Sequence, residues 1–179
     1  MRVCVLGSGS KGNCTYIECG DTKVLVDAGL SCAQIEKRLQ TIGINPFSIS
    51  AILVTHEHSD HIAGAPQFAQ KFGTKIFTHK DTWNAMYQKF DKLPSTSLVE
   101  ISEGDFSIND VFVNAFSVSH DAAHCMGFSV QHNKSRISLA TDLGIMTDKI
   151  KNIQEEAKTN LSEQQINDLD VLIKNFSPK

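Results

Sequence analysis

Apolar residues in the first part of the chain occur in short runs that are separated by polar turn residues. Residues 2–6 (RVCVL), 14–19 (CTYIEC) and 23–27 (KVLVD) are rich in strand-forming residues and are bounded by Gly, Asn or Asp. Runs of this length and composition predict β-strands. We expect the three strands to form a β-meander.

A helical period begins after residue 30. Ser31 and Gln34 have the spacing of a capping box, in which each side chain accepts from the backbone N–H of the other residue. Three apolar residues then fall on one helical face, namely Ile35, Leu39 and Ile42. The Asn-Pro pair at residues 45–46 ends this predicted helix.

The middle of the chain alternates between strands and helices. Residues 51–55 (AILVT) predict a buried strand because they are continuously apolar, and a helix at 62–73, a strand at 74–78 and a helix at 80–90 follow. Further strands and then polar helices are predicted at residues 97–101, 110–119, 126–132, 135–141, 147–157 and 162–176. This order predicts an α/β sandwich of two mixed β-sheets flanked by helices, with residues 1–179 as a single domain.

The composition adds little to this picture. The chain has 179 residues, 41% of them hydrophobic, which is enough for one buried core. A net charge of -3 gives no basic field and argues only weakly against a nucleic-acid substrate. The N-terminal residues turn polar too early for a signal peptide, and no apolar run reaches the length of a membrane span. We therefore expect a cytoplasmic protein that does not act at a membrane.

The stretch VTHEHSDHIAG follows a predicted strand and concentrates three histidines and two acidic residues in six positions. Side chains two residues apart face the same way in an extended segment, so His56 and His58 can bind one ion while Glu57 points elsewhere. Asp60 and His61 come where the chain turns into a helix, and they can reach a second position. Such ligands suit Zn²⁺, with Mn²⁺ or Fe²⁺ as alternatives.

Two ions need more ligands than this cluster offers, since each takes about four, solvent included. The stretches FSVSHDA and LATDLG supply them at or just beyond two predicted strand ends. His120 can add a third imidazole to the first ion, and the carboxylate of Asp142 can bridge both ions. The cluster and these two residues therefore predict a metal centre at the edge of a sheet.

The motif THEHSDH resembles the H-x-H-x-D-H motif of the metallo-β-lactamase superfamily. LVDAG, SHDA and ATDLG resemble the other motifs of that fold, in the expected order. The stretches VLGSGSKGNCTYIE and SHDAAHCMGFSV resemble the WalJ/YycJ branch, bacterial metal-dependent hydrolases regarded as nucleases that act on DNA. The resemblance covers about residues 1–150. It implies the metallo-β-lactamase-type αββα sandwich.

The resemblance also implies a role for each matching residue. The first metal would be held by three imidazoles, those of His56, His58 and His120. The second metal, zinc or manganese like the first, would be held by Asp60, His61 and the bridging Asp142. Asp27 resembles the family's buried carboxylate that orients the metal loop, although a turn residue at a strand end is the alternative.

The reaction implied by the resemblance is hydrolysis by a hydroxide that the metals generate from water. Asp60 would orient this hydroxide for attack on a phosphodiester of DNA. His124 could donate a proton to the leaving group or contact a phosphate, and a role as a bystander is an equal alternative.

Three further sequence features carry weaker predictions. The glycine-rich residues 7–13, with Lys11, could offer backbone N–H groups to a phosphate or could form only a tight connection between strands. His79 and His132 are each isolated in the sequence. Both are therefore expected to be ordinary surface or core histidines.

The last part of the chain departs from the family pattern. Family members carry a late histidine in a stretch like G-H-L-S-N, whereas this sequence has no histidine after His132. The nearest match places Asn160 at that position, and an amide is a poorer ligand for zinc than an imidazole. In a second register, residues 170–176 form a late core strand. Both registers imply a sandwich shortened at its C-terminal end, with one or two metals bound and a homo-oligomer as one way to cover the exposed edge.

Three functions remain open from the sequence. The leading one is a metal-dependent phosphodiesterase or nuclease acting on DNA. The same ligands would also serve a hydrolase of a small ester, thioester or lactam. The missing late histidine allows a third alternative, a degenerate, non-catalytic member that binds metal or regulates.

Overall fold

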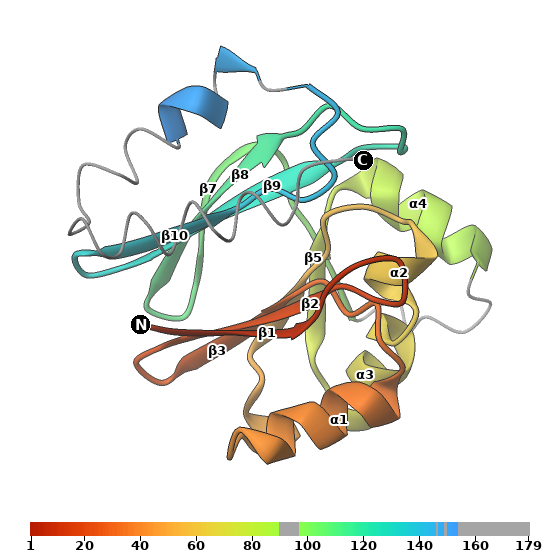
Figure 1. Ribbon diagram of the computed structural model, residues 1–179, viewed down its shortest axis with the longest axis vertical. Coiled ribbons are helices and arrows are strands. Elements are labelled where there is room, and N and C mark those ends of the chain that lie inside the picture. The colour runs from red at the N-terminus through yellow and green to blue at the C-terminus, as the bar shows by residue number, and fades with distance from the viewer. Residues whose placement is uncertain (90–96, 146, 149, 154–179) are drawn as a thin grey trace.

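The computed structural model describes residues 1–89, 97–145, 147, 148 and 150–153. Its strands form two sheets that pack face to face (Figure 1). The first sheet has six strands in sequence order: β1 (Arg2–Gly7), β2 (Cys14–Cys19), β3 (Thr22–Val26), β4 (Ala51–Leu53), β5 (Lys75–Thr78) and β6 (Leu98–Glu100). The second has four strands: β7 (Gly104–Ile108), β8 (Val111–Ser117), β9 (Met126–His132) and β10 (Ser135–Leu139).

The first sheet is mixed. Strands β1, β2 and β3 form the predicted meander with antiparallel pairing, whereas β3, β4, β5 and β6 pair in parallel. As a result β1, β3, β4 and β5 all run in one direction, and their carboxyl ends meet at one edge of the sheet. The described strands of the second sheet pair only antiparallel, where a mixed sheet was expected.

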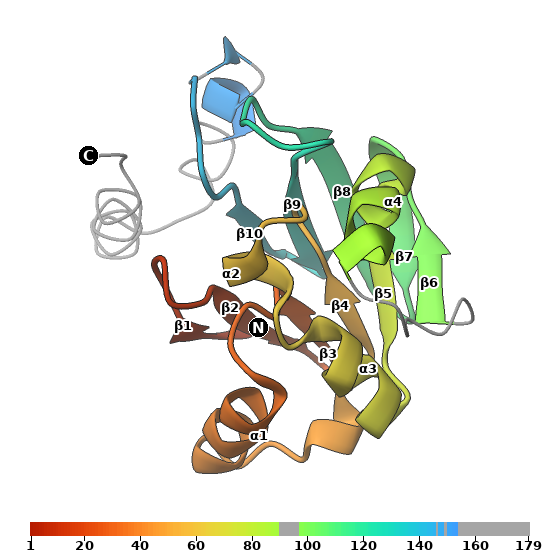
Figure 2. The same ribbon diagram turned by 90° about the vertical axis from the view of Figure 1, so that its right-hand side faces the viewer.

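Helices lie outside the two sheets (Figure 2). They are α1 (Cys32–Thr41), α2 (Ser59–Ile62), α3 (Ala65–Phe72) and α4 (Lys80–Lys89), with a 3-10 turn at Pro46–Ser48. Ile150 and Ile153 pack with Phe116 in a small cluster on the second sheet's other face. The layers are those of the predicted αββα sandwich. No helix in the described part of the chain is both long and apolar enough to cross a membrane.

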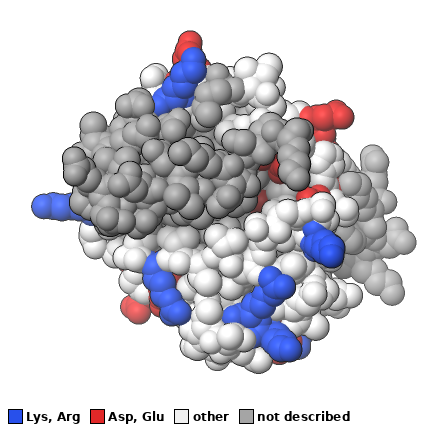
Figure 3. Space-filling model, viewed as in Figure 1, with Lys and Arg blue, Asp and Glu red and all other residues white. Residues whose placement is uncertain are grey.

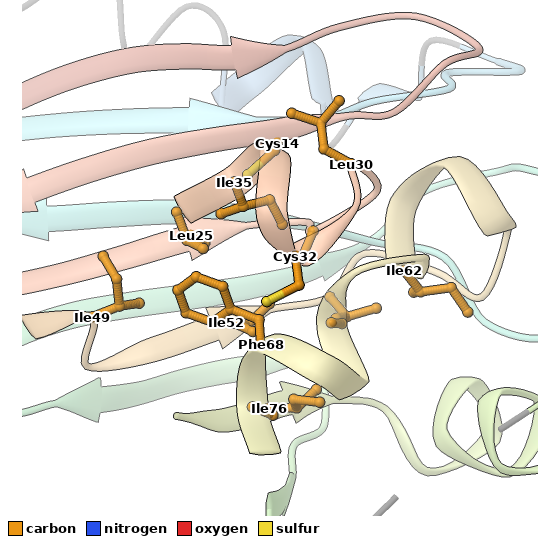
Figure 4. Close-up of a cluster of buried hydrophobic side chains, with 14 of the residues drawn as sticks. Cys14, Leu25, Leu30, Cys32, Ile35, Ile49, Ile52, Ile62, Phe68 and Ile76 are labelled. Carbon is orange, nitrogen blue, oxygen red and sulfur yellow. The ribbon is translucent and has the colours of Figure 1, made fainter. Parts of the chain in front are cut away.

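Each central strand of the first sheet contributes to two cores, which explains its continuous apolar sequence. In β4, Ile52 faces the helices while Ala51 and Leu53 face the second sheet. In β3, Leu25 and Val26 are divided in the same way. Figure 4 shows part of the helix-side core, where Ile52 and Phe68 lie among buried side chains from α1, α3 and the sheet.

Local sequence signals explain most of the element boundaries. Ser31 and Gln34 form the predicted capping box at the start of α1. The helix predicted at 62–73 corresponds to α3, which begins only after Gly64, where a Cβ atom would lie 2.1 Å from the Leu30 carbonyl oxygen. Helix α2 precedes it and shares only Ile62 with the prediction, and strand β7 was not predicted. Of the late predicted helices, residues 147, 148 and 150–153 are described and all of them except Thr147 are helical, whereas 162–176 and Asn160 lie outside the described residues.

Candidate metal centre

The histidine-rich segment leaves β4 at the edge where the two sheets meet, and backbone hydrogen bonds fix its path. Val54 N–H donates to the Phe77 carbonyl of β5 at 2.9 Å. One residue later, the Thr55 carbonyl accepts from Met126 N–H of β9 at 3.0 Å. The segment is therefore attached to both sheets before its first histidine.

Three imidazoles form the first donor set, which consists of His56, His58 and His120. Nδ1 of His58 lies 3.1 Å from Nε2 of His56 and 3.2 Å from Nε2 of His120. The three ring pairs are nearly perpendicular, with interplanar angles of 78° to 82°. Ligands about 2.0–2.1 Å from a tetrahedral metal lie about 3.3 Å apart, so these nitrogens have the spacing of zinc ligands.

The second donor set consists of Asp60, His61 and Asp142. Nε2 of His61 lies 3.0 Å from Oδ2 of Asp142 and 3.6 Å from Oδ2 of Asp60. The same Asp142 oxygen lies 3.9 Å from Nε2 of His56, which belongs to the first set. Asp142 therefore approaches both His56 and His61, and the donor atoms of these three residues all lie within 4.8 Å of one another, which suits ligands of one small divalent cation. Asp60 contacts this group through His61.

Two aspartates of the centre have a backbone conformation that L-residues rarely adopt. The φ angle is 60° at Asp27 and 54° at Asp142. Such conformations cost energy and persist where the surrounding structure enforces them, often at functional sites. Both carboxylates therefore face the histidines from a backbone conformation that is locally unfavourable.

Asp27 links β3 to the donor sets. Its buried carboxylate accepts from Thr55 N–H at 2.8 Å and from the Thr55 hydroxyl at 3.0 Å. It also lies 2.7 Å from Nδ1 of His61. Nδ1 of His61 therefore donates its hydrogen to Asp27. The other ring nitrogen, Nε2, faces Asp142.

Burial and neighbouring charges move the histidine pKa values in opposite directions. Burial, together with the nearby His61, lowers the pKa of His56 to about 3. For His61, burial acts in the same direction, but hydrogen bonds to Asp142 and Asp27 outweigh it and raise the pKa to about 10. The metal-free protein therefore keeps a proton on His61, and a cation that binds there must displace it.

Two residues that sequence reasoning did not assign to the centre hold its parts together. Glu57 is buried and points away from the donor sets, where its Oε1 accepts from Ala123 N–H at 2.9 Å. It thereby holds the segment that carries His120. Nδ2 of Asn13 lies 3.1 Å from Oδ2 of Asp60 and 3.0 Å from Nε2 of His61. No local signal marks either role, because both contacts join distant segments.

His79 is not isolated, contrary to the expectation from the sequence. Its ring stacks on that of His124, with centroids 3.7 Å apart and planes inclined by 18°. Although Asp81 brings a carboxylate near the pair, nearly parallel rings cannot both direct an in-plane lone pair at one ion. Burial, followed by the charge of His79, lowers the pKa of His124. His132 is far from the centre and contacts Asp110 on the surface.

The structure thus brings together all six residues that the sequence analysis assigned as ligands, and they come from both sheets. His56, His58, Asp60 and His61 follow β4, whereas His120 follows β8 and Asp142 follows β10. His124 lies near the amino end of β9 and pairs with His79 instead of joining a donor set.

Comparison with curated proteins gives relatives over most of the chain. It is 37% identical over 164 residues to "Exodeoxyribonuclease YycJ" of Bacillus anthracis, covering 91% of this chain and 62% of that protein. It is 36% identical over 175 residues to "Exodeoxyribonuclease WalJ" of Streptococcus pneumoniae, covering 96% of this chain and 65% of that protein. The chain therefore spans less than two thirds of the length of either relative.

Solved structures and a family match agree with the fold. A metallo-β-lactamase from Cronobacter sakazakii superimposes with a TM-score of 0.67 over 88% of this chain and 69% of its own, at 16% identity, which shows the fold alone. Residues 7–172 match the metallo-beta-lactamase superfamily. With two packed sheets and a histidine-rich segment at their common edge, the chain belongs to the metallo-β-lactamase superfamily.

Proposed function

We propose that the protein is a metal-dependent phosphodiesterase, a nuclease that acts on DNA. The superfamily implies divalent metal binding, and the observation that carries the proposal is a pair of adjacent donor groups, one of His56, His58 and His120 and one of His56, His61 and Asp142. The two relatives named as exodeoxyribonucleases favour DNA over other substrates.

In this proposal three imidazoles would hold the first cation: His56, His58 and His120. Asp60, His61 and Asp142 would hold the second. The second set takes its remaining donor from water or from Asn160, which lies outside the described residues. When bound, zinc or manganese supplies a hydroxide nucleophile at neutral pH and neutralises negative charge on phosphoryl oxygens.

The chain's own residues orient this chemistry. Asp60 would direct a carboxylate oxygen toward the nucleophile, and the Asn13 side-chain amide donates to Oδ2 of that carboxylate at 3.1 Å. Asp27 keeps His61 in one tautomer and one orientation, with Nδ1 as the donor. Glu57 keeps the segment of His120 against the first donor set.

His124 has a different role in the proposal. Burial lowers the pKa of His124, which favours the neutral imidazole and makes the ring a poorer proton donor to a leaving group. A neutral imidazole still offers one N–H. We therefore assign His124 a contact with a phosphate oxygen in preference to general acid catalysis.

The proposal is tested by metal content and cleavage together. Elemental analysis should find close to two metals per chain in the parent protein and fewer in His61→Ala, with His132→Ala as a remote control. Single-stranded DNA should be cleaved in Zn²⁺ or Mn²⁺ and not in a chelator.

Other results would contradict the proposal. Cleavage of a chromogenic lactam or thioester without cleavage of DNA would mean that the protein is an acyl hydrolase. Bound metal without any turnover would identify a non-catalytic binding protein.

A further inference from the structure

The loop that follows β1, residues 8–13, lies at the same sheet edge as the donor sets. Figure 1 shows it turning back beside α2. Asn13 attaches it there, because its N–H donates to the Asp60 carbonyl at 2.6 Å and its carbonyl accepts from Gly29 N–H at 2.8 Å. The loop is therefore held against the segment that carries the second donor set.

The backbone of this loop depends on glycine. The φ angle is +93° at Gly9 and +135° at Gly12, which L side chains rarely adopt. A Cβ atom at Gly12 would lie 2.8 Å from the backbone of Gly29, whereas one at Gly9 would meet nothing within 4 Å. Gly9 N–H donates to the side-chain oxygen of Asn13 at 2.9 Å. The loop therefore packs against Gly29 at Gly12, whereas its tip at Gly9 faces solvent.

The tip carries groups that bind anions. Residues 8–11 are all exposed, whereas Gly12 is buried and Asn13 is partly buried. The exposed residues offer two hydroxyls, the Lys11 ammonium group and a backbone that a ligand can approach closely at Gly9. This combination of glycine backbone, hydroxyls and a cation suits a phosphate group.

The remainder of this edge is acidic. The segments 8–13, 27–31, 54–61, 79–81, 118–125 and 140–145 contain six acidic residues but only two lysines, Lys11 and Lys80. Figure 3 shows Lys and Arg side chains standing apart on the visible face, without a continuous basic patch. Among the described residues of this edge, a polyanion that reaches the donor sets therefore meets individual cationic side chains, and Lys11 is carried by the loop that contacts Asp60.

Resting on the proposed function, we infer that the loop of residues 8–11 binds a phosphate of the DNA strand next to the one being cleaved. Lys11 supplies the charge, and the hydroxyls of Ser8 and Ser10 supply hydrogen bonds. Asn13 sets the distance between this phosphate site and the metal centre, because the same residue contacts Asp60 and His61.

The first test measures binding of the DNA strand separately from its cleavage. Fluorescence anisotropy with a labelled single-stranded oligonucleotide, in a chelator that prevents cleavage, should give a Kd about five to ten times higher for Lys11→Ala than for the parent protein. The slope of log Kd against log salt should fall by about 0.7, the value for one lost phosphate contact on single-stranded DNA. Lys75→Ala is the matched control, since Lys75 is exposed at the amino end of β5, opposite to the end that faces the donor sets.

Two further measurements complete the design. With metal present, Lys11→Ala should raise KM for the oligonucleotide and leave the hydrolysis of bis(p-nitrophenyl) phosphate unchanged, because that small diester has no neighbouring phosphate. Gly9→Ala should weaken DNA binding and also lower the melting temperature, because a φ angle of +93° is strained for an L side chain even though the methyl group has space.

The outcomes distinguish this inference from the proposed function. Equal Kd values for Lys11→Ala, Lys75→Ala and the parent protein would overturn the phosphate site, even if the protein cleaves DNA. A parent protein that binds the oligonucleotide through Lys11 but cleaves no phosphodiester would support the site and contradict the nuclease proposal.

Discussion

Two groups of histidines lie at the same edge of the structure, yet their geometries differ. In the first donor set the rings of His56, His58 and His120 are nearly perpendicular to one another, and Nδ1 of His58 lies 3.1 to 3.2 Å from a nitrogen of each of the other two. The rings of His79 and His124 are closer still, with centroids 3.7 Å apart, but they are inclined by only 18°. Imidazoles lie close together in both groups. The angle between the ring planes distinguishes the candidate donor set from the stacked pair.

The supporting contacts explain this difference. In the metal centre, the Thr55 hydroxyl lies 2.9 Å from Nδ1 of His56 and Asp27 lies 2.7 Å from Nδ1 of His61, which leaves Nε2 of each ring to face the other donors. His79 instead accepts from the N–H of Asp81 at 3.2 Å, which directs its Nδ1 along the start of α4. A hydrogen bond to one ring nitrogen thus decides what the other nitrogen can bind.

The largest expected effect is the loss of a ligand. His120→Ala should remove metal from the first donor set and reduce phosphodiester cleavage by more than about a hundredfold, because even loss of an outer partner costs 10- to 100-fold. His79→Ala should leave metal content unchanged. Metal analysis and initial rates on both variants measure the contrast, and equal metal loss in the two would remove the distinction drawn between the groups.

A smaller effect is expected from the partner of a ligand. Asp27→Asn keeps the size of the side chain but weakens the bond to Nδ1 of His61, so metal affinity should fall by about 10- to 100-fold. Competition with a chromogenic chelator measures it. Unchanged affinity would mean that Asp27 only fills its buried position.

Substitutions of Glu57 test whether its hydrogen bond to Ala123 holds the segments of the two sheets together at the candidate metal centre. Glu57→Ala leaves the Ala123 N–H without this acceptor, which should cost about 1–3 kcal/mol of folding free energy. Glu57→Gln retains an oxygen acceptor and should cost clearly less. Urea unfolding of both variants provides the comparison, and equal losses would count against the hydrogen bond as the cause.

The pH dependence of the metal-free protein should reflect the opposite pKa shifts of two ligands. Between about pH 3 and 6.5 the unfolded chain binds a proton at His56 that the folded chain excludes, so stability rises with pH. Between 6.5 and about 10 the folded chain retains a proton on His61 that the unfolded chain loses, so stability falls. Melting temperatures in a chelator should therefore peak near pH 6.5, and the fall above that pH should disappear in His61→Ala.

The smallest effect concerns the stacked pair itself. His124→Ala should reduce cleavage of DNA only about two- to tenfold, the value of one neutral hydrogen bond of about 0.5–1.5 kcal/mol. Its rate should show the same pH dependence as that of the parent protein. A change in the pH profile would instead identify His124 as a general acid.

The sequence correctly predicted local features, which depend on residues that are close together in the chain. The capping box of Ser31 and Gln34 and the opposite directions of His56 and Glu57 follow from local spacing, and the structure contains both. The strand predicted at 51–55 is present as the shorter β4, Ala51–Leu53. Strand β7 was missed because its sequence, GDFSI, has only two apolar residues and gains its strand conformation from pairing with β8.

By itself, therefore, the sequence determined the fold class and the histidine-rich segment, and its six metal ligands stay a prediction. Only the tertiary structure decided that Asp142 approaches both His56 and His61, that Glu57 and Asn13 hold the donor sets, and that His79 stacks on His124. The reason is physical: periodicity reports which face a side chain takes within its own element. Distances between side chains on different strands depend instead on how two sheets pack, and that packing is set by the whole core.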